Sequence, residues 1–174
     1  MKTCSVARQK RHDTRDCATV KRVSDRESIP CACSCGATSF HVNSEPLFRI
    51  LCHCTICQHY NNAPFADVLV FRANDVTLPP VDSVDYRTYK PPPNVKRGRC
   101  ASCEQAAVEV FDTPLMPKLV MVPRPMFGED ADLPTPSAHI FYNERVADAD
   151  DAYPKHEGFF RSEFAFLKQL LSAR

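Results

Sequence analysis

The sequence predicts a mainly β protein, small and rich in loops, that ends in a short helix. Fifteen prolines, only four glycines and no tryptophan suit an irregular β protein better than a helical bundle. Short strand-like segments recur between turn signals through most of the chain. Near its end, apolar residues recur at helical spacing instead. The 174 residues are enough for one domain with a hydrophobic core.

Seven segments either alternate between apolar and polar residues or are rich in β-branched and aromatic ones, as strands are. The first two are separated by a turn signal, Asn-Ser-Glu-Pro at 43–46. Three consecutive prolines at 91–93 must interrupt whatever strand precedes them. The predicted strands cover residues 37–42, 47–51, 66–71, 84–89, 106–111, 119–122 and 138–142.

The predicted helix lies at the end of the chain. Phe160, Phe164, Leu167 and Leu171 recur at helical spacing, which indicates an amphipathic helix that begins at about residue 158. We expect this apolar stripe to pack on its own domain. A contact within a homodimer is the second use that the stripe suggests.

The charge of the chain is near zero but unevenly distributed. A formal net charge of +1 disfavours a protein that binds nucleic acid by charge alone. The first 30 residues hold eight Lys and Arg residues against four acids. We interpret residues 1–29 as a basic, disordered tail and residues 30–174 as a single domain.

No segment indicates a membrane or an export route. No apolar run approaches the roughly 18 residues that cross a bilayer, and the N-terminus lacks the apolar core of an export signal. We therefore expect no membrane partner and a cytoplasmic location. In that reducing compartment, clustered cysteines are expected to bind metal rather than form disulfides.

Seven of the ten cysteines fall into three tight groups, which is the strongest functional signal in the sequence. The groups are Cys33-Ser-Cys35, Cys52-His-Cys54-Thr-Ile-Cys57 and Cys100-Ala-Ser-Cys103. A disulfide between residues two apart would close a very small, strained ring. A zinc ion instead accepts both sulfurs readily, at about 2.3 Å each. The spacing therefore predicts zinc ligands.

The first and last groups together supply four thiolates, which is the ligand set of a closed, tetrahedral zinc site. We predict that Cys33, Cys35, Cys100 and Cys103 are structural zinc ligands. The two pairs are far apart in sequence, so one ion would close a long loop, and its binding free energy would become folding free energy. Gly36 follows Cys35 directly and suits a tight turn in which backbone amides approach the sulfurs.

The middle group supplies three thiolates from one short stretch, at the end of a predicted strand and in a predicted loop. Three protein ligands leave one coordination position open, as catalytic zinc sites do. Thiolate-rich zinc lowers the pKa of bound water less than zinc held by imidazoles, so capture of an incoming thiol suits it better than hydrolysis. We predict that Cys52, Cys54 and Cys57 are catalytic zinc ligands, which gives two Zn²⁺ ions per chain.

Three residues near these groups leave alternatives open. Cys31 forms a second Cys-x-Cys pair with Cys33 and is a rival to the neighbouring ligands. His59 is the main rival for the open position of the middle site, and its ligation would make that site structural as well. His53 lies between two ligands and must point away from the metal that they share. Otherwise, either histidine is a polar loop residue.

The combined pattern resembles the glutathione-dependent formaldehyde-activating enzyme family, which also includes centromere protein V. The motifs that carry the resemblance are Cys-x-Cys-Gly, then Cys-His-Cys-x-x-Cys, then a final Cys-x-x-Cys. Further similar stretches lie at residues 57–65, 137–145 and 150–159. The resemblance covers residues 31–159.

This resemblance implies a zinc-bound, mostly antiparallel β structure called a β-tent. It assigns the four outer cysteines to the structural zinc and the three middle cysteines to the catalytic zinc. The implied reaction joins glutathione and formaldehyde as S-(hydroxymethyl)glutathione, which is the activity of a carbon–sulfur lyase. The expected partner is therefore a small-molecule thiol such as glutathione, and Arg72, Arg97 and Arg124 are candidates, by charge alone, to bind its carboxylates.

The chain departs from the family pattern at two places. Glu104 stands where the family usually has a glycine after the last Cys-x-x-Cys, and it places a negative charge beside an anionic zinc site. Asn61-Asn62 stands where the family usually has a glycine after the middle motif. Asparagine tolerates a positive φ better than most residues, so that turn can survive. Neither change removes a ligand.

Two other classes of function compete with the enzyme. A non-catalytic zinc module would carry glutathione or bind nucleic acid or protein, and the basic tail and the Lys-Arg-Gly-Arg sequence at 96–99 favour it slightly. A redox or metal-buffer protein would use the many thiols in reversible oxidation. Near-neutral charge and the absence of aromatic residues interleaved with basic ones weigh against nucleic acid.

Overall fold

The structure is a computed structural model that describes residues 28–90, 95–114 and 116–173. The tail predicted at 1–29 therefore lies outside the described residues except for its last two. Of these two, Ile29 already belongs to the first strand, so the ordered β structure begins earlier than the sequence indicated. That strand includes Pro30, which is tolerated because the strand lies at the edge of its sheet.

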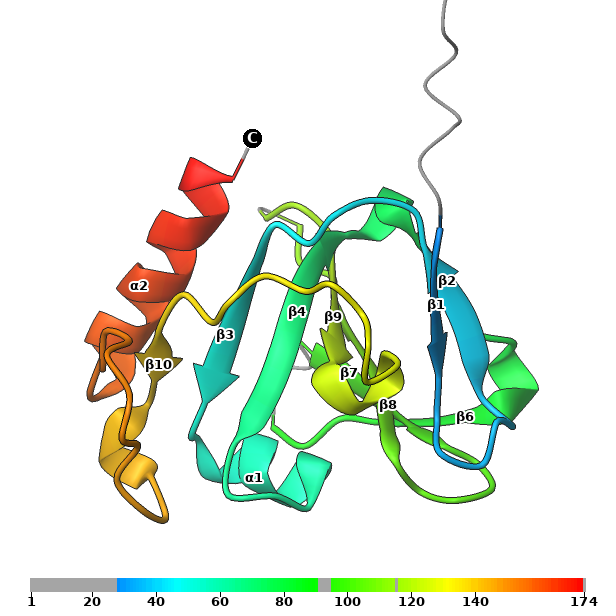
Figure 1. Ribbon diagram of the computed structural model, residues 1–174, viewed down its shortest axis with the longest axis horizontal. Helices are drawn as coiled ribbons and strands as arrows, with labels where there is room; N and C mark the ends of the chain where they lie inside the picture. The colour runs from blue at the N-terminus through cyan, green and yellow to red at the C-terminus, as the bar shows by residue number, and fades with distance from the viewer. Residues whose placement is uncertain (1–27, 91–94, 115, 174) are drawn as a thin grey trace, which may run out of the picture.

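Ten strands and two α-helices make up the described fold (Figure 1). The helices are α1 (Thr55–Asn61) and α2 (Phe159–Ser172). The strands are β1 (Ile29–Ala32), β2 (Ser39–Val42), β3 (Phe48–Cys52), β4 (Ala66–Arg72), β5 (Val76–Thr77), β6 (Val84–Arg87), β7 (Val95–Cys100), β8 (Ala106–Phe111), β9 (Leu119–Pro123) and β10 (His139–Ile140). The predicted mainly β fold with a C-terminal helix is confirmed.

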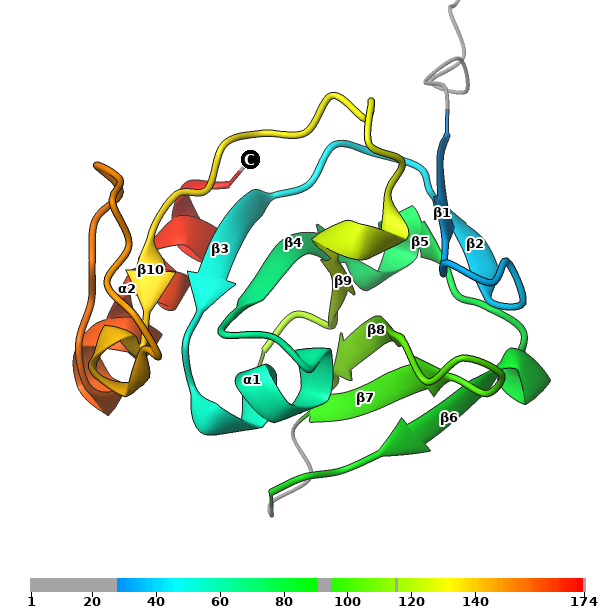
Figure 2. The same cartoon turned by 60° about the horizontal axis from the view of Figure 1, so that its bottom comes forward.

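The strands form two sheets. The small sheet has the order β1-β2-β5, and the large sheet has the order β10-β3-β4-β9-β8-β7-β6. Neighbouring strands are antiparallel except β10 and β3, which are parallel. Figures 1 and 2 show the small sheet at one end of the molecule and α2 at the other, beside β10 and β3.

β4, an interior strand of the large sheet, is buried on both faces. Leu69 and Phe71 belong to a core that the large sheet shares with the small sheet. Ala66, Val68 and Val70 belong to a second core, on the side that α2 covers. This double burial explains why the sequence of β4 is an almost continuous apolar run rather than an alternating one.

Four elements were not predicted from the sequence: β1, β5, β7 and α1. The most informative is β7, whose Lys-Arg-Gly-Arg sequence does not resemble a strand. It forms because it pairs with β6 on one side and with β8 on the other. Three predicted strands are shorter than expected. β2 begins only at Ser39, β6 ends at Arg87, and β10 ends before Phe141, whose φ is 53°.

The helix α2 forms where it was predicted, but the face that it buries is different. The buried residues are Ser162, Ala165 and Leu170. Phe160 is 86% exposed and Phe164 is 69% exposed, so the prediction that their stripe packs on its own domain is wrong. The small residues on the other face let the helix lie close to β10, which a phenylalanine face would not.

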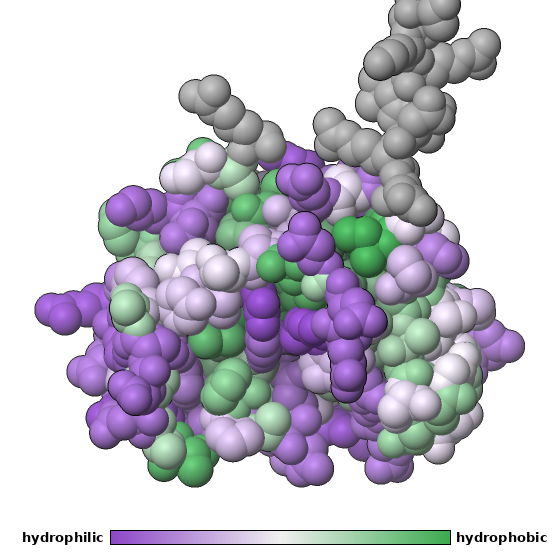
Figure 3. Space-filling model, in the orientation of Figure 1, coloured by the Kyte–Doolittle hydropathy of each residue, from purple (hydrophilic) through white to green (hydrophobic). Residues whose placement is uncertain are grey.

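Exposed apolar side chains are concentrated on α2. Among the residues that the structure describes, half of the large exposed hydrophobic side chains belong to it. Elsewhere polar and apolar residues alternate over the surface, and on the face drawn in Figure 3 hydrophilic and hydrophobic side chains lie among one another. In the described part of the chain, no helix is long and apolar enough to cross a membrane.

The packing of β6 on β7 can be tested at Gly98. A Cβ atom there would lie against Val84 Cγ1 and 2.9 Å from Tyr86 Cε1. We expect Gly98→Ala to lower the free energy of unfolding by about 1–3 kcal/mol. Gly128→Ala is the matched control, because nothing lies within 4 Å of its Cβ position, and it should change the value by less than about 0.5 kcal/mol. Equal effects of the two variants in urea unfolding would contradict this packing.

Candidate metal centres

The first cysteine cluster brings together two turns from different sheets. Cys33 and Cys35 lie between β1 and β2, whereas Cys100 ends β7 and Cys103 lies in the turn that leads to β8. The four Sγ atoms lie within 4.8 Å of one another. Cys33 Sγ is 3.4 Å from Cys35 Sγ and 3.5 Å from Cys100 Sγ. The structure thus assembles the four cysteines that the sequence grouped.

This cluster has the geometry that a tetrahedral metal ion requires. Sulfurs bound to zinc at about 2.3 Å are about 3.8 Å apart, close to the observed separations. Backbone amides also point at the sulfurs, since Thr38 N donates to Cys33 Sγ at 3.3 Å and Ser102 N donates to Cys100 Sγ at 3.4 Å. Burial alone would raise the pKa of Cys100, but hydrogen bonds from Thr38 and from the backbone of the turn lower it to about 6. The donor set therefore suits a soft cation.

Residues with positive φ shape the turns beside the cysteines. Gly36 has φ 75° and Glu104 has φ 58°. A residue with a Cβ atom adopts this conformation at a cost, so Glu104 strains the backbone in addition to adding charge. Asn62 ends α1 at φ 49° and ψ 46°. The turn after the middle motif therefore survives without its glycine, as the sequence suggested.

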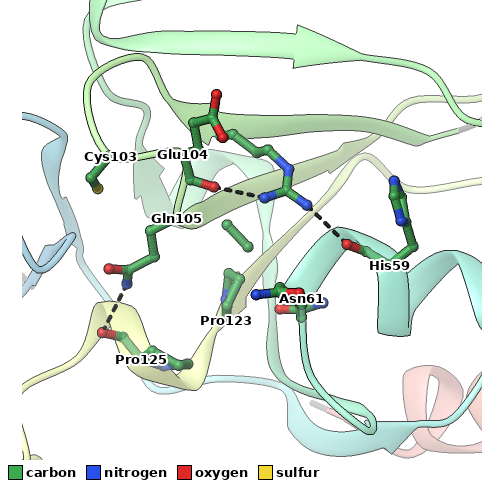
Figure 4. A pocket seen from close by; sticks show the side chains of 10 residues that line it. His59, Asn61, Cys103, Glu104, Gln105, Pro123 and Pro125 are labelled. Atoms are coloured by element: carbon green, nitrogen blue, oxygen red, sulfur yellow. Dashed lines mark hydrogen bonds between the residues drawn. The ribbon is translucent and has the colours of Figure 1, made fainter.

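Arg99 connects the two cysteine motifs. Its guanidinium donates to Glu104 O at 2.7 Å and to His59 O at 2.9 Å (Figure 4). The second of these carbonyls belongs to the last turn of α1, where a cation also interacts favourably with the helix dipole. A polar pocket of about 540 Å³ opens beside Arg99, and Cys103 lines it. The turn of the first cluster and the helix of the second are thus linked directly.

The second cluster is built where β3 passes into α1. Cys52 is the last residue of β3, Cys54 occupies the N-cap position of α1 and Cys57 lies within the helix. The segment is therefore helical where a loop was predicted. Cys57 and Tyr60 share the buried face of α1. The Tyr60 hydroxyl donates to Gly98 O at 2.7 Å, where the register between β7 and β8 shifts, and this bond holds the helix against the large sheet.

The three sulfurs of this cluster, the cysteine trio, lie within 4.8 Å of one another. Cys52 Sγ and Cys54 Sγ are 3.6 Å apart. The pKa of Cys54 falls to about 3, because the thiols of Cys52 and Cys57 hydrogen-bond to its thiolate. Among the described residues, no fourth His, Cys, Asp or Glu joins the trio. Three soft donors with one side open also fit a zinc ion.

Neither of the alternative ligands joins a cluster. Cys31 lies opposite Phe40 in the small sheet and is 1% exposed, and burial raises its pKa to about 12. His59 is exposed on α1, with its ring edge-on to Tyr89 at 5.8 Å. Among the described residues, Cys31 therefore lies outside the four-cysteine cluster, and no histidine joins the three middle cysteines.

His53 turns toward β10 and begins a buried polar chain. Its Nε2 lies 2.8 Å from His139 Nδ1, and His139 Nε2 lies 3.0 Å from Asp151 Oδ2. The carboxylate of Asp151 accepts a hydrogen bond from His139 Nε2, so His139 Nδ1 accepts a hydrogen bond from His53 Nε2. Burial lowers the pKa of His53 to about 4, which keeps it neutral. Together with Glu144 Oε2, which accepts from Thr55 N at 2.9 Å, this chain fixes the start of α1.

A cavity of about 760 Å³ opens in front of the trio. It lies between the large sheet and α2, and all three cysteines line it. Most of the remaining lining is apolar and comes from both walls. A cavity of this size, largely apolar and with a few polar groups, is typical of small-molecule sites.

A buried ion pair supplies the polar part of the cavity. Arg97 and Glu109 lie opposite each other in β7 and β8, with Arg97 Nε 2.7 Å from Glu109 Oε2. The N–H of Arg97 is not aimed at that oxygen, so charge rather than a directed hydrogen bond holds the pair. Burial raises the pKa of Glu109 to about 7, and Arg97 opposes the rise. The guanidinium also favours the thiolate form of Cys54.

The sequence identified the sulfurs but missed most of their surroundings. Of the three arginines proposed by charge, Arg97 lines the cavity, whereas Arg124 donates to carbonyls of its own loop and Arg72 lines neither cavity. Glu109 was not singled out, although a lone acid within the apolar strand 106–111 was a usable signal. The pairing of His53 with His139 joins residues 86 apart and left no local signal.

Comparison with known proteins places the cysteines within a described family. The family model named glutathione-dependent formaldehyde-activating enzyme matches residues 28–144, which include both clusters and exclude α2. Among solved structures, the chain is similar to a Rhodobacter sphaeroides protein, with 16% identity, a TM-score of 0.48, and coverage of 60% of this chain and 92% of that chain. A search of curated proteins found no match.

The turns beside the first cluster can be tested by a pair of substitutions. Glu104→Gly removes the backbone cost at φ 58° and should raise the free energy of unfolding by about 1 kcal/mol. Gly36→Ala introduces such a cost at φ 75°, where nothing lies within 4 Å of the new Cβ, and should lower it by about 1 kcal/mol. Guanidinium unfolding of the metal-loaded variants measures both. A loss of stability in Glu104→Gly would contradict the assigned backbone strain.

Proposed function

Because the chain belongs to the glutathione-dependent formaldehyde-activating enzyme family, we propose that it is a carbon–sulfur lyase that joins a thiol, glutathione or a similar one, to formaldehyde. The observation that carries this proposal is the cysteine trio. Its three sulfurs lie in one cluster, no fourth ligand from the described residues joins them, and they line a large cavity. A closed four-cysteine site would leave no room for a substrate sulfur.

We propose that zinc is the metal at both clusters. Cys33, Cys35, Cys100 and Cys103 would hold a structural ion, and the trio would hold the second. Zinc held by three thiolates supplies a position at which an incoming thiol loses its proton near neutral pH and remains a nucleophile. The separations between the sulfurs and the amides aimed at them support this metal for the first cluster.

The residues around the trio prepare the site for a thiolate. Arg97 places a positive charge beside the sulfurs, which offsets the charge that thiolates accumulate. Tyr60 and the chain of His53, His139 and Asp151 fix both ends of the cysteine segment. In the reaction, the sulfur bonds to the aldehyde carbon, the C=O double bond becomes a single bond, and its oxygen takes the proton that the thiol released. No oxidant or reductant is needed.

The role of the trio can be tested with Cys54→Ser, with Cys31→Ala as the matched control. Cys54 is partly exposed in the trio, whereas Cys31 is a buried cysteine outside both clusters. We expect Cys54→Ser to keep its circular dichroism spectrum, to lose one of two zinc ions per chain, and to lose calorimetric binding of both glutathione and 2-sulfanylethanol. Cys31→Ala should keep both ions and the binding.

Three outcomes would contradict or narrow this proposal. Unchanged thiol binding by Cys54→Ser would place the thiol elsewhere. Loss of the fold in Cys54→Ser would make the middle site structural. Binding without any acceleration of S-(hydroxymethyl)glutathione formation above the spontaneous rate would make the protein a thiol carrier rather than a lyase.

A further inference from the structure

The cavity in front of the trio has two apolar walls. Ile50, Val68 and Met121 line it from the large sheet. Phe159, Phe164 and Leu167 line it from α2. A polar tripeptide would leave these walls without matching partners, whereas a hydrocarbon group would remove them from water.

The wall on α2 is not part of the family match. That match ends at residue 144, and α2 begins at Phe159. The sulfurs are therefore in the shared part of the chain, whereas one side of the cavity is supplied by a segment beyond it. An element of this kind can set which substrate is accepted without altering the reacting group.

The helix is fixed firmly enough to act as a wall. Phe48 and Phe166 meet edge to face at 5.1 Å between ring centroids. Ser162 Oγ accepts the N–H of Phe141 at 2.7 Å, which ties α2 to the end of β10. Phe141 is held at φ 53°, a strained conformation for a phenylalanine, and its ring lies 6.3 Å from that of Phe159. Both rings line the cavity.

The α2 side chains that line the cavity are partly exposed to solvent, and an apolar ligand in the cavity would cover them. Phe164 is 69% exposed and Leu167 is 38% exposed, although both face the cavity. Their side chains contribute little to the core, which Ala165 and Leu170 reach instead. Occupation of the cavity by a hydrocarbon group would bury this surface.

The charges of the cavity disfavour glutathione. Glutathione carries two carboxylates and one ammonium group, in addition to its thiol. Among the described lining residues, the carboxylates Glu109, Glu144 and Glu163 outnumber the cations Lys90 and Arg97. Arg97 is already paired with Glu109 at 2.7 Å. The trio adds further negative charge when its sulfurs are thiolates, so two more carboxylates would be repelled.

We propose that this cavity selects a thiol whose organic group is apolar and of aromatic size, in preference to glutathione. The inference rests on the proposed function, because it takes the trio as the place where the sulfur binds. The chemistry is unchanged: the thiol sulfur bonds to the carbonyl carbon, the C=O double bond becomes a C–OH single bond, and the thiol proton ends on that oxygen. The walls choose the group that the sulfur carries.

Phenylmethanethiol, 2-sulfanylethanol and glutathione form a suitable series of probes for the zinc-loaded protein. We expect calorimetry to give an affinity for phenylmethanethiol about tenfold higher than for either polar thiol, and Cys54→Ser to abolish it. Phe164→Ser should weaken phenylmethanethiol at least about fivefold and leave 2-sulfanylethanol unchanged. Phe160→Ser is the matched control, because Phe160 lies one helical turn away, is 86% exposed and does not line the cavity. The affinity of this variant for phenylmethanethiol should stay within about twofold of that of the unsubstituted protein.

The outcomes separate this inference from the function on which it rests. Binding of glutathione that depends on Cys54 and equals or exceeds that of phenylmethanethiol would overturn the inference and leave the proposed function standing. Equal effects of Phe164→Ser and Phe160→Ser would overturn it as well. Failure of every thiol to bind, or binding that survives Cys54→Ser, would overturn both.

Discussion

The four-cysteine cluster joins the small sheet to the turn between β7 and β8, and so brings the two sheets together at one point. From that turn, residues of β7 connect the cluster to α1. Gly98 accepts a hydrogen bond from Tyr60, and Arg99 reaches from Glu104 O to His59 O. Both contacts hold α1, the helix that carries Cys57. The four-cysteine cluster is therefore connected to the trio through a single strand.

The two clusters differ in how they are assembled, and this difference matches their proposed roles. The first draws its cysteines from segments at least 65 residues apart, so an ion bound there would stabilise the long loop between them. The trio comes from one strand-to-helix junction, so its geometry is local and its surroundings can vary. Those surroundings are an ion pair of the large sheet and an apolar wall from α2, both remote in sequence.

Local patterns in the sequence predicted the cysteine groups and most strands, whereas several features that depend on strand pairing were missed. Cysteine spacing identified both clusters, and apolar runs identified most strands. β7 was missed because its three cationic residues are untypical of a strand, although it pairs with β6 on one side and with β8 on the other. The buried face of α2 was misassigned because apolar residues occur around most of the helix, and the contact with Phe141 selects the face with Ser162 and Ala165. Glu109 and Arg97 are paired only by the register of β8 on β7.

We propose that four sulfurs close one zinc site, whereas three sulfurs leave the other open. Zinc X-ray absorption of the protein, combined with metal analysis, tests it most directly. We expect two zinc ions per chain and a mean shell of about 3.5 sulfurs and about 0.5 oxygen or nitrogen. A mean shell of four sulfurs, or a single zinc ion per chain, would contradict the account.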